Sequence, residues 1–363
     1  MNTYAEISLD AIKHNIKEIK SHLSPKTRFM AVVKANAYGH GAVAVSRAAE
    51  EAGADYLAVA NLREALELRE AGMLLPILIL TESPTSVMDE IIQHKLTQTV
   101  YSYSEAKALS DEAVKRSKKA LVHIKVDTGM GRVGVQPSEA IALYNKIASL
   151  PNLIIEGVFT HFAKAEEHTD SFTKQQLDKF ISIVSRLDKV EIKHAANSAA
   201  TMFHPETHLD MVRVGLMMYG IYPYGGAHRS ITLRPALSFK TRVAYIKRVP
   251  AETPLSYGGI FVTNKETSIA TLPVGYADGY SRRLSNHAQV LIKGKRFPIV
   301  GRISMDMTLV DIKDAKIEVG EEVVLIGTQG METISADELA RLDDTVSYEI
   351  ICGIGKRVPR IYK

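Results

Sequence analysis

The sequence predicts an α/β protein: a (β/α)8 barrel of the TIM type, followed by a mostly antiparallel β domain. Over the first two thirds of the 363 residues, short apolar runs recur at regular intervals with helical patterns between them. Strands that alternate with helices in this way are typical of a closed, parallel barrel. From about residue 233, alternating strand patterns broken by Gly, Pro, Asn and Asp replace this rhythm, which indicates antiparallel sheet.

The predicted barrel strands are short and mostly continuously apolar. They lie at residues 28–34, 55–60, 76–80, 97–102, 120–127, 153–162, 190–197 and 212–220. Continuous apolar runs are expected of parallel strands that are covered on both faces. The seventh run is the least apolar of the set, and the helical segment that follows it, SAATMFH, is short.

Helical patterns fill most of the gaps between these strands. Residues 61–72 begin with Asn61 as an N-cap, carry Glu64 three positions later and close at Gly72, a typical start and stop. Further helices are predicted at residues 84–95, 102–116 and 173–189. In the last of these, apolar side chains recur at helical spacing.

The change of rhythm predicts two domains, residues 1–232 for the barrel and residues 233–363 for the β domain. The segment YGGAHRSITLRP (224–235) surrounds this boundary. Within the β domain, one clear helix is predicted near residues 335–342.

Composition excludes several classes of protein. The chain is 46% hydrophobic and 24% charged, and its net charge of +4 is spread along the sequence, which argues against nucleic-acid binding. The densest basic run, Arg116–Lys119, is expected at a solvated helix end. Cys352 is the single cysteine, so an intramolecular disulfide and a CxxC zinc site are impossible. No signal peptide or membrane-spanning run is recognisable, so we expect a cytoplasmic protein.

Polar residues stand where the predicted strands end, at the edge of a barrel that carries catalytic groups. They are Lys34, Asp127, Arg132, His161, Asn197, Ser198, Arg213 and Tyr219. A lone lysine after an apolar strand is most simply an ion-paired surface residue. Together with the other groups, Lys34 favours a Schiff-base lysine for an aldehyde cofactor, of which pyridoxal phosphate is the usual one. Tyr38, Ser198 and the turn at Gly215 suit its phosphate.

These residues lie in segments that resemble a known family. AVVKANAYGHG (31–41) resembles the cofactor-lysine signature of bacterial alanine racemases. The segments VDTGMGRVG, EGVFTHFA, HAANSAA, VRVGLMMYG, LSYGG, TLPVGYADGY, VGRISMDM and SYEI resemble others of that family in its order, over nearly the whole chain. The resemblance implies a homodimeric isomerase that uses pyridoxal 5'-phosphate to interconvert L-alanine and D-alanine, and that supplies D-alanine for the peptidoglycan of the cell wall.

The resemblance also implies two catalytic bases. Lys34 would carry the cofactor and serve D-alanine, while Tyr257 would serve L-alanine from the partner subunit. Racemisation needs a base on each face of the planar α-carbon, because one side chain cannot easily reach both faces. Without the resemblance, the simplest interpretation of Tyr257 is an aromatic residue that packs on the domain surface.

Further roles are implied residue by residue. The cofactor-binding set is Lys34, Tyr38, His161, Asn197, Ser198, Arg213, Gly215, Leu216 and Tyr348, with Arg213 facing the pyridine nitrogen. Arg132 and the backbone N–H of Met305, from the partner, would hold the substrate carboxylate. Lys125 matches a lysine that is often carbamylated. The entrance would involve Tyr276, Arg282, Arg302 and Tyr348, with Glu166 and Val346 at variable positions and Asp306 nearby.

The sequence is also compatible with purely structural roles for some of these residues and with other functions. His161 could be a satisfied core histidine, Arg213 could pair with Asp210, and the Met305 side chain could belong to the core. The alternatives to an alanine racemase are a racemase of wider range acting on serine or lysine, a non-catalytic pyridoxal-phosphate-binding barrel, and a decarboxylase of similar architecture. The non-catalytic barrel would not need Tyr257 or a β domain, and the motifs disagree with a decarboxylase.

Overall fold

The computed structural model describes residues 2–167, 171–223 and 231–363, which fall into two compact units. The barrel unit contains Ala11–Ala37 and Ala42–Arg234. The β unit contains Met1–Asp10, Tyr38–Gly41 and Pro235–Lys363. Each unit therefore includes segments that are separate in the sequence.

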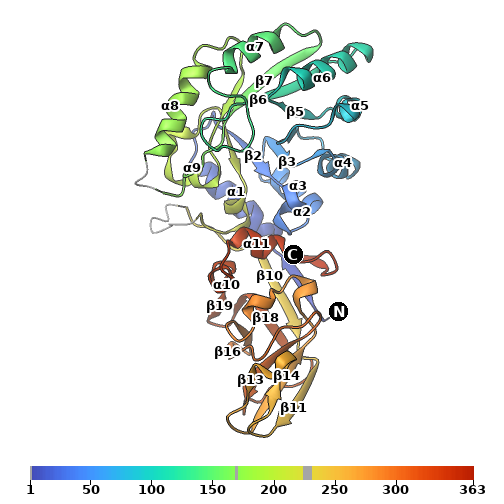
Figure 1. The fold of residues 1–363 in the computed structure, drawn as a ribbon, viewed down its shortest axis with the longest axis vertical. Helices are drawn as coiled ribbons and strands as arrows, with labels where there is room; N and C mark the ends of the chain where they lie inside the picture. Colours follow the sequence, from blue (N-terminus) through green and yellow to red (C-terminus); the bar gives the residue numbers. More distant parts are fainter. Residues whose placement is uncertain (1, 168–170, 224–230) are drawn as a thin grey trace. The chain divides into compact units, whose positions relative to one another are not determined.

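The barrel unit is built on a closed barrel of parallel strands, as predicted (Figure 1). The strands are β2 (Arg28–Val32), β3 (Tyr56–Val59), β4 (Ile77–Ile79), β5 (Thr97–Val100), β6 (Ala120–Lys125), β7 (Leu153–Phe159), β8 (Ile192–His194) and β9 (Met211–Val214). The barrel closes because β2 pairs with both β3 and β9. All eight predicted strands are confirmed, with ends shorter than the apolar patterns suggested.

The predicted extension of the eighth strand to Gly220 is wrong. Strand β9 ends at Val214, and η3 (Leu216–Tyr219) follows it. Gly215 leaves the extended conformation, with φ of −115° and ψ of −89°, and its N–H donates to the Ser198 hydroxyl at 3.0 Å. The apolar run continues past the strand because Leu216, Met217, Met218 and Tyr219 are all buried. Burial without alternation could not distinguish a strand from this 3-10 turn.

Helices follow the strands around the barrel (Figure 1). They are α1 (Leu9–Ser21), α2 (Lys34–Tyr38), α3 (Ala42–Glu51), α4 (Leu62–Glu70), η1 (Thr85–Val87), α5 (Met88–Gln93), α6 (Tyr103–Lys115), α7 (Ala140–Ala148), α8 (Phe172–Val184), α9 (Ser198–Phe203) and η2 (Pro205–Thr207). The predicted N-cap of α4 is confirmed, because the Asn61 side chain accepts from the Glu64 N–H. Arg116 is the C-cap of α6, which agrees with a helix end for the basic run.

The segment after β2 has an unusual backbone. Ala35, Asn36, Ala37 and Tyr38 all have φ between 52° and 54°, so α2 is a left-handed helical turn. Each left-handed residue other than glycine or asparagine costs about 1–2 kcal/mol. The sequence pattern predicted a strand up to Lys34. Instead, β2 ends at Val32 and Lys34 begins this turn.

The β unit contains a mainly antiparallel sheet in the order β16-β15-β18-β10-β1-β20, with β19 paired to β18. Its strands are β1 (Tyr4–Ile7), β10 (Leu237–Arg242), β15 (Gln289–Ile292), β16 (Lys295–Pro298), β18 (Glu322–Gln329), β19 (Glu332–Ile334) and β20 (Arg360–Tyr362). Smaller sheets join β11 (Tyr245–Val249), β14 (Thr267–Leu272) and β17 (Thr308–Lys313), and β12 (Pro254–Leu255) with β13 (Phe261–Val262). Among the described strands of the main sheet, only β1 and β20 pair in parallel.

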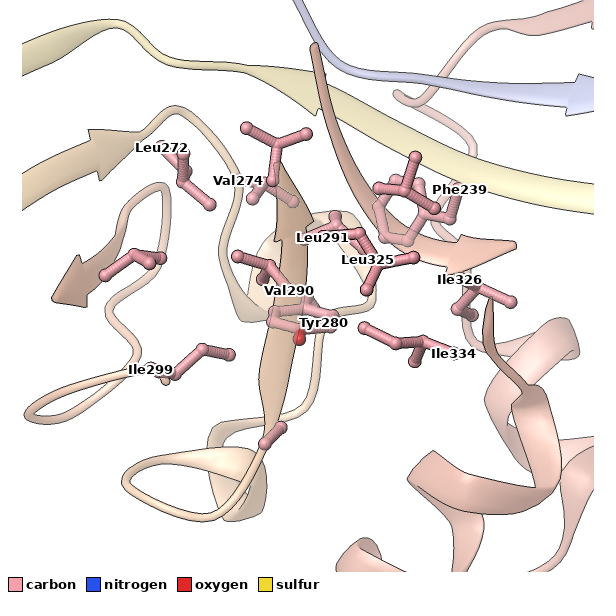
Figure 2. Packing of buried hydrophobic residues seen from close by; sticks show 14 of the residues in the cluster. Phe239, Leu272, Val274, Tyr280, Val290, Leu291, Ile299, Leu325, Ile326 and Ile334 are labelled. Atoms are coloured by element: carbon pink, nitrogen blue, oxygen red, sulfur yellow. The ribbon is translucent and has the colours of Figure 1, made fainter. Parts of the chain in front are cut away.

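The β unit has its own hydrophobic core. Figure 2 shows side chains from β10, β14, β15, β18 and β19 directed into one interior, among them Phe239, Leu291 and Leu325. A fully buried side chain of this size contributes roughly 1.5–3 kcal/mol. The predicted helix near 335–342 is confirmed as α10 (Ala336–Asp343). The pattern missed α11 (Ser347–Cys352), which is short and has no side-chain hydrogen bond at its N-cap.

The division between the units differs from a single boundary at residues 232 and 233. It falls between Arg234 and Pro235, and the first ten residues join the β unit. The reason is strand pairing, because β1 pairs with β10 and β20. The first residues of the expected boundary segment, YGGAHRS, lie outside the described residues. Among the described helices, none is long and apolar enough to cross a membrane.

Candidate functional site

The predicted site residues of the barrel unit lie in the C-terminal parts of its strands or directly after them. Lys34 begins the turn after β2, Lys125 is the last residue of β6, and His161 comes two residues after β7. Asn197 is the N-cap of α9, after β8. Arg213 lies within β9, where it is paired with Met30 of the neighbouring β2. The parallel barrel thus places these groups at the same ends of their strands.

Arg213 is buried and held on every side by hydrogen bonds. Its Nη2 donates to the carbonyl oxygens of Thr160 at 2.7 Å and Ala195 at 3.0 Å. Nη2 also lies 3.2 Å from His161 Nδ1, and Nη1 lies 3.0 Å from His194 Nδ1. Among the described residues, none of these partners is a carboxylate, and the alternative pairing with Asp210 does not occur. Burial lowers the pKa of Arg213 to about 9, so the guanidinium is still protonated at neutral pH.

His161 is neutral in this environment. Burial, followed by the positive charges of Arg213 and Arg132, holds the pKa of its imidazole well below the ordinary value. The hydrogen bond from Arg213 uses Nδ1 as an acceptor, which a neutral ring provides. The structure thus places His161 beside Arg213, and its side chain is half-buried instead of belonging to the core.

Positive charge gathers at this end of the barrel. Burial, and then the charges of Arg132, Arg213 and Lys34, lowers the pKa of Lys125 to about 8 despite the opposing effect of Asp127. Asp127 accepts from the N–H groups of Gly129 and Gly131 at 3.1 Å, which shapes the loop that leads to Arg132. Several cations acting on one another raise the free energy of the unliganded site, and an anionic ligand lowers it.

Ser198, Gly215 and Leu216 form a second group at the ends of β8 and β9. The buried Ser198 hydroxyl accepts from the N–H groups of Gly215 at 3.0 Å and Met217 at 3.5 Å. The Asn197 side chain caps α9 by accepting from the Ala200 N–H at 2.9 Å. These contacts bring together the backbone turns that were predicted to suit a phosphate.

The turn that begins at Lys34 is held by side chains from elsewhere in the barrel unit. Glu64 accepts from the Ala35 N–H and the Ala60 N–H, each at 2.7 Å, and so joins the turn to the start of α4. The Asn36 side chain accepts from the Ala42 N–H at 2.8 Å. These hydrogen bonds offset part of the cost of the left-handed backbone. The sequence pattern suggested only a helix-capping role for Glu64.

Within the β unit, Tyr38 and Tyr348 lie together, with ring centroids 5.9 Å apart. Burial, and then the neighbouring Tyr348, raises the pKa of Tyr38, so its phenol stays protonated. Gly39 must lack a side chain, because a Cβ there would lie 2.3 Å from the carbonyl oxygen of Ile351 in α11. Helix α11 carries Tyr348, so this close approach helps to bring the two rings together.

Tyr257 and Met305 are exposed on the β unit. The exposed fraction is 72% for Tyr257 and 52% for Met305, which rules out a core position for the Met305 side chain in this unit. Tyr257 begins η4 (Tyr257–Gly259), and the preceding Ser256 donates its hydroxyl to the Arg302 carbonyl at 2.6 Å. This bond joins two of the segments that carried the family resemblance, LSYGG and VGRISMDM.

Met305 is also joined to the segment TLPVGYADGY. Its carbonyl accepts from the Ala277 N–H at 3.1 Å, beside η5 (Tyr276–Asp278). Gly275 is required at this junction, because a Cβ would lie 2.4 Å from the Met305 carbonyl oxygen. Asp306 accepts from Arg357 at 2.6 Å, and Arg357 also donates to Asp278 at 2.7 Å.

The remaining entrance residues lie in separate places. Arg282 begins η6 (Arg282–Leu284) and, like Val346, is exposed in the β unit. Glu166 lies in the barrel unit after β7, where burial raises the pKa of its carboxyl group.

Sequence reasoning missed a polar group inside the barrel. His123 of β6 lies 2.8 Å from His194 of β8, measured from Nδ1 to Nε2, and 3.0 Å from Glu156 of β7, measured from Nε2 to Oε2. Tyr56 of β3 donates to the same carboxylate oxygen at 2.6 Å. The available signal was the presence of histidine, glutamate and tyrosine within otherwise apolar strand patterns.

The chain is similar to alanine racemases along its whole length. The family model of the alanine racemase N-terminal domain matches residues 7–223, and that of the C-terminal domain matches residues 236–362. An alanine racemase of Halothermothrix orenii is 47% identical over 366 residues, covering 99% of this chain and 97% of that protein. The solved alanine racemase of Clostridium difficile 630 superposes with a TM-score of 0.96 at 40% identity, covering 100% of this chain and 96% of that one. A histidine racemase of Leuconostoc mesenteroides superposes at 0.91, with 28% identity and 100% and 98% coverage.

Proposed function

The chain belongs to the alanine racemase family, and from this premise we propose that it interconverts L-alanine and D-alanine with pyridoxal 5'-phosphate. The single observation that carries the proposal is the full-length match to both family domains, in order. The cationic strand ends of the barrel support it, because the cofactor phosphate and the alanine carboxylate are both anions.

The predicted donor set fits this cofactor. An amine for its aldehyde is present in Lys34, and a permanently donating guanidinium for its ring nitrogen is present in Arg213. For the phosphate, the proposed groups are Tyr38, Asn197, Ser198, Gly215, Leu216 and Tyr348, with His161 beside the ring. When bound, pyridoxal phosphate supplies an electron-accepting ring that stabilises negative charge on the α-carbon of the amino acid.

We assign the two proton transfers to Lys34 and Tyr257. The Lys34 amine removes or returns the α-proton on the face that D-alanine presents, and the Tyr257 phenol does so on the opposite face. Each general acid–base group of this kind contributes roughly 10²- to 10⁴-fold to the rate. Arg213 would face the ring nitrogen of the bound cofactor and leave it unprotonated, because a guanidinium holds its proton far more tightly than a pyridine nitrogen does.

The substrate carboxylate is assigned to Arg132, whose planar guanidinium suits a carboxylate, and to the backbone N–H of Met305. We further propose that the enzyme is a homodimer in which Tyr257 and Met305 act on the site of the partner subunit. Their exposure in the β unit supports this assignment. In this division, residues 1–232 form the cofactor-binding domain, and residues 233–363 supply the second base and add Tyr348 to the phosphate-binding groups. The proposed role is cytoplasmic supply of D-alanine for peptidoglycan.

The experiment that tests the proposal is isotope exchange by a Tyr257→Phe variant in D₂O. Wild-type enzyme should racemise both enantiomers and exchange their α-protons. The variant should lose roughly 10²- to 10⁴-fold in racemisation, because one proton transfer is missing. It should still exchange the α-proton of D-alanine with retention, because Lys34 remains, and should exchange that of L-alanine poorly.

The matched control is Tyr245→Phe, since Tyr245 is another exposed tyrosine of the β unit and has no assigned role. It should behave as wild type. Racemisation at the parental rate by Tyr257→Phe would overturn the assignment of the second base. A panel of L-amino acids tests the substrate, and faster turnover of serine, lysine or histidine than of alanine would reject alanine as the preferred substrate.

A further inference from the structure

A chain of hydrogen bonds crosses the interior of the barrel from Arg213 to Tyr56. It runs from Arg213 on β9 to His194 on β8, to His123 on β6, to Glu156 on β7, with donor–acceptor distances of 3.0, 2.8 and 3.0 Å. Tyr56 on β3 closes it with a bond of 2.6 Å to Glu156. Both histidines are fully buried, and Arg213 and Tyr56 are only 4% exposed.

Two local features of β7 fit this chain closely. The register of β6 and β7 shifts between Val122 and His123, so that Val122 pairs with Ile155 and His123 with Gly157. Glu156 is therefore the extra residue of a bulge, a feature that redirects a side chain. A Cβ on Gly157 would lie 2.7 Å from the His123 ring, so the absence of a side chain makes room for the imidazole.

The two ends of this hydrogen-bond chain, Glu156 and Arg213, determine which ring nitrogen of each histidine carries the proton. A carboxylate only accepts, so His123 must carry its proton on Nε2 and present a bare Nδ1. His194 must then donate from Nε2, which leaves its Nδ1 bare. A guanidinium only donates, and a bare Nδ1 of His194 is the acceptor that Arg213 requires. With one proton on each imidazole, every hydrogen bond has one donor and one acceptor. A second proton on either ring would place two N–H donors against each other.

The charges of the surrounding groups agree with this assignment. Burial is the largest influence on the pKa of His123 and lowers it, and the charge of Arg213 acts in the same direction. The hydrogen bond and charge of Glu156, and the charge of Glu191, raise this pKa but do not outweigh the lowering. Burial, and then the charges of Arg213 and His123, holds the pKa of His194 well below the ordinary value. Burial alone would raise the pKa of Glu156, but hydrogen bonds from His123 and Tyr56 outweigh it.

We propose that Glu156 is the counter-charge of Arg213 and acts through His123 and His194 as its positioning residue. The inference rests on the proposed function only for the target of Arg213, the ring nitrogen of the cofactor. Arg213 is a buried cation with no carboxylate partner among the described residues that contact it, and a buried charge without compensation is costly. The two neutral imidazoles, each in one tautomer, link the Glu156 carboxylate to the guanidinium through hydrogen bonds that all point in one direction. The last of these bonds holds Nη1 of Arg213 in place.

The test is the tautomeric state of the two imidazoles in the holoenzyme, measured by ¹⁵N NMR with labelled histidine. In the wild type, His123 and His194 should both carry the proton on Nε2, unchanged from about pH 6 to about pH 9. In Glu156→Gln, His123 should show a mixture of tautomers, because a carboxamide can donate as well as accept. Substitution of each histidine by glutamine assigns the signals.

The matched control is Glu191→Gln, which removes a carboxylate paired with Arg28, where both side chains are substantially exposed. Its imidazole signals should equal those of the wild type. In steady-state assays, Glu156→Gln should lower kcat by roughly tenfold with little change in KM, by analogy with the lower end of the effect of removing carboxylates that orient metal-bound imidazoles. Glu191→Gln should leave both constants unchanged.

Unchanged imidazole signals in Glu156→Gln, or a proton on Nδ1 of His194 in the wild type, would overturn the proposal. The NMR measurement requires no turnover, so it stands whether or not the protein racemises alanine. If Glu156→Gln fails to fold, Tyr56→Phe provides the second variant. It removes a donor to Glu156 but keeps the carboxylate, so the His123 tautomer should persist, and its loss would also overturn the proposal.

Discussion

At Lys125, burial and neighbouring positive charge act in the same direction. They lower the pKa of its amine to about 8, with burial as the largest cause and Arg132 and Arg213 next. An amine reacts with carbon dioxide only in its neutral form, forming an N–C bond and releasing a proton to solvent. At a pKa of 8, about a tenth of the amine is neutral at pH 7 and about nine tenths at pH 9. The resulting carbamate would replace a cation beside Arg132 with an anion.

We therefore predict that Lys125 is carbamylated, and increasingly so as the pH rises through 8 at a fixed concentration of dissolved carbon dioxide. The measurement is ¹³C NMR of the protein in ¹³C-enriched carbon dioxide. Lys125→Ala should remove the carbamate signal. Lys193→Ala, which changes a half-buried lysine of β8, should keep it. A signal that survives Lys125→Ala would assign the carbamate to another amine.

At the scale of elements, the turn α2 depends on a carboxylate from α4. Glu64 accepts from the Ala35 N–H beside Lys34 and from the Ala60 N–H before the helix. Asn61 caps the same helix through the Glu64 N–H but does not touch α2. The start of α4 therefore has two structural roles: Asn61 caps the helix, and Glu64 supports the turn α2. This allows the support of the Lys34 turn to be separated from the capping of α4.

Glu64→Ala should lower the free energy of unfolding by about 1–3 kcal/mol, because it removes two hydrogen bonds to backbone N–H groups, each with a net contribution of about 0.5–1.5 kcal/mol. It should also weaken cofactor retention, because the left-handed turn loses its bond at Ala35. Asn61→Ala should cost about 1 kcal/mol and leave cofactor retention unchanged. Denaturant unfolding and the visible absorbance of the purified proteins measure the two effects. Equal cofactor retention in both variants would show that Glu64 acts only on α4.

The ends of helices and strands also show what local sequence patterns can and cannot predict. The run 212–220 is apolar throughout, yet β9 ends at Val214 because Gly215 turns to meet Ser198, a residue 17 positions earlier. Helix α4 was predicted almost to the residue, since Asn61, Glu64 and Gly72 are signals within one segment. Local signals therefore predicted the ends of α4 well, although the helix predicted at residues 173–189 ends at Val184 as α8. A strand that ends through a distant contact is not visible in its own residues.

At the scale of the whole molecule, the proposed homodimer makes a test by complementation possible. Lys34→Ala and Tyr257→Ala should each be inactive alone. Subunits mixed by unfolding and refolding should give half heterodimers, each with one intact site if Tyr257 acts on the partner. The mixture should then recover about a quarter of wild-type activity. No recovery, together with dimers of normal size, would place both bases in one subunit.

The sequence by itself determined the succession of strands and helices, the change to a β domain near residue 233 and the segments shared with alanine racemases. These features are local, because apolar periodicity and capping residues act within one element. Only the tertiary structure decided that the first strand joins the β unit, that α2 is left-handed, and that His123 meets His194 across 71 residues. Such contacts depend on strand register and on close approach between distant backbones. A one-residue bulge at Glu156 is enough to redirect them, and no local pattern encodes it.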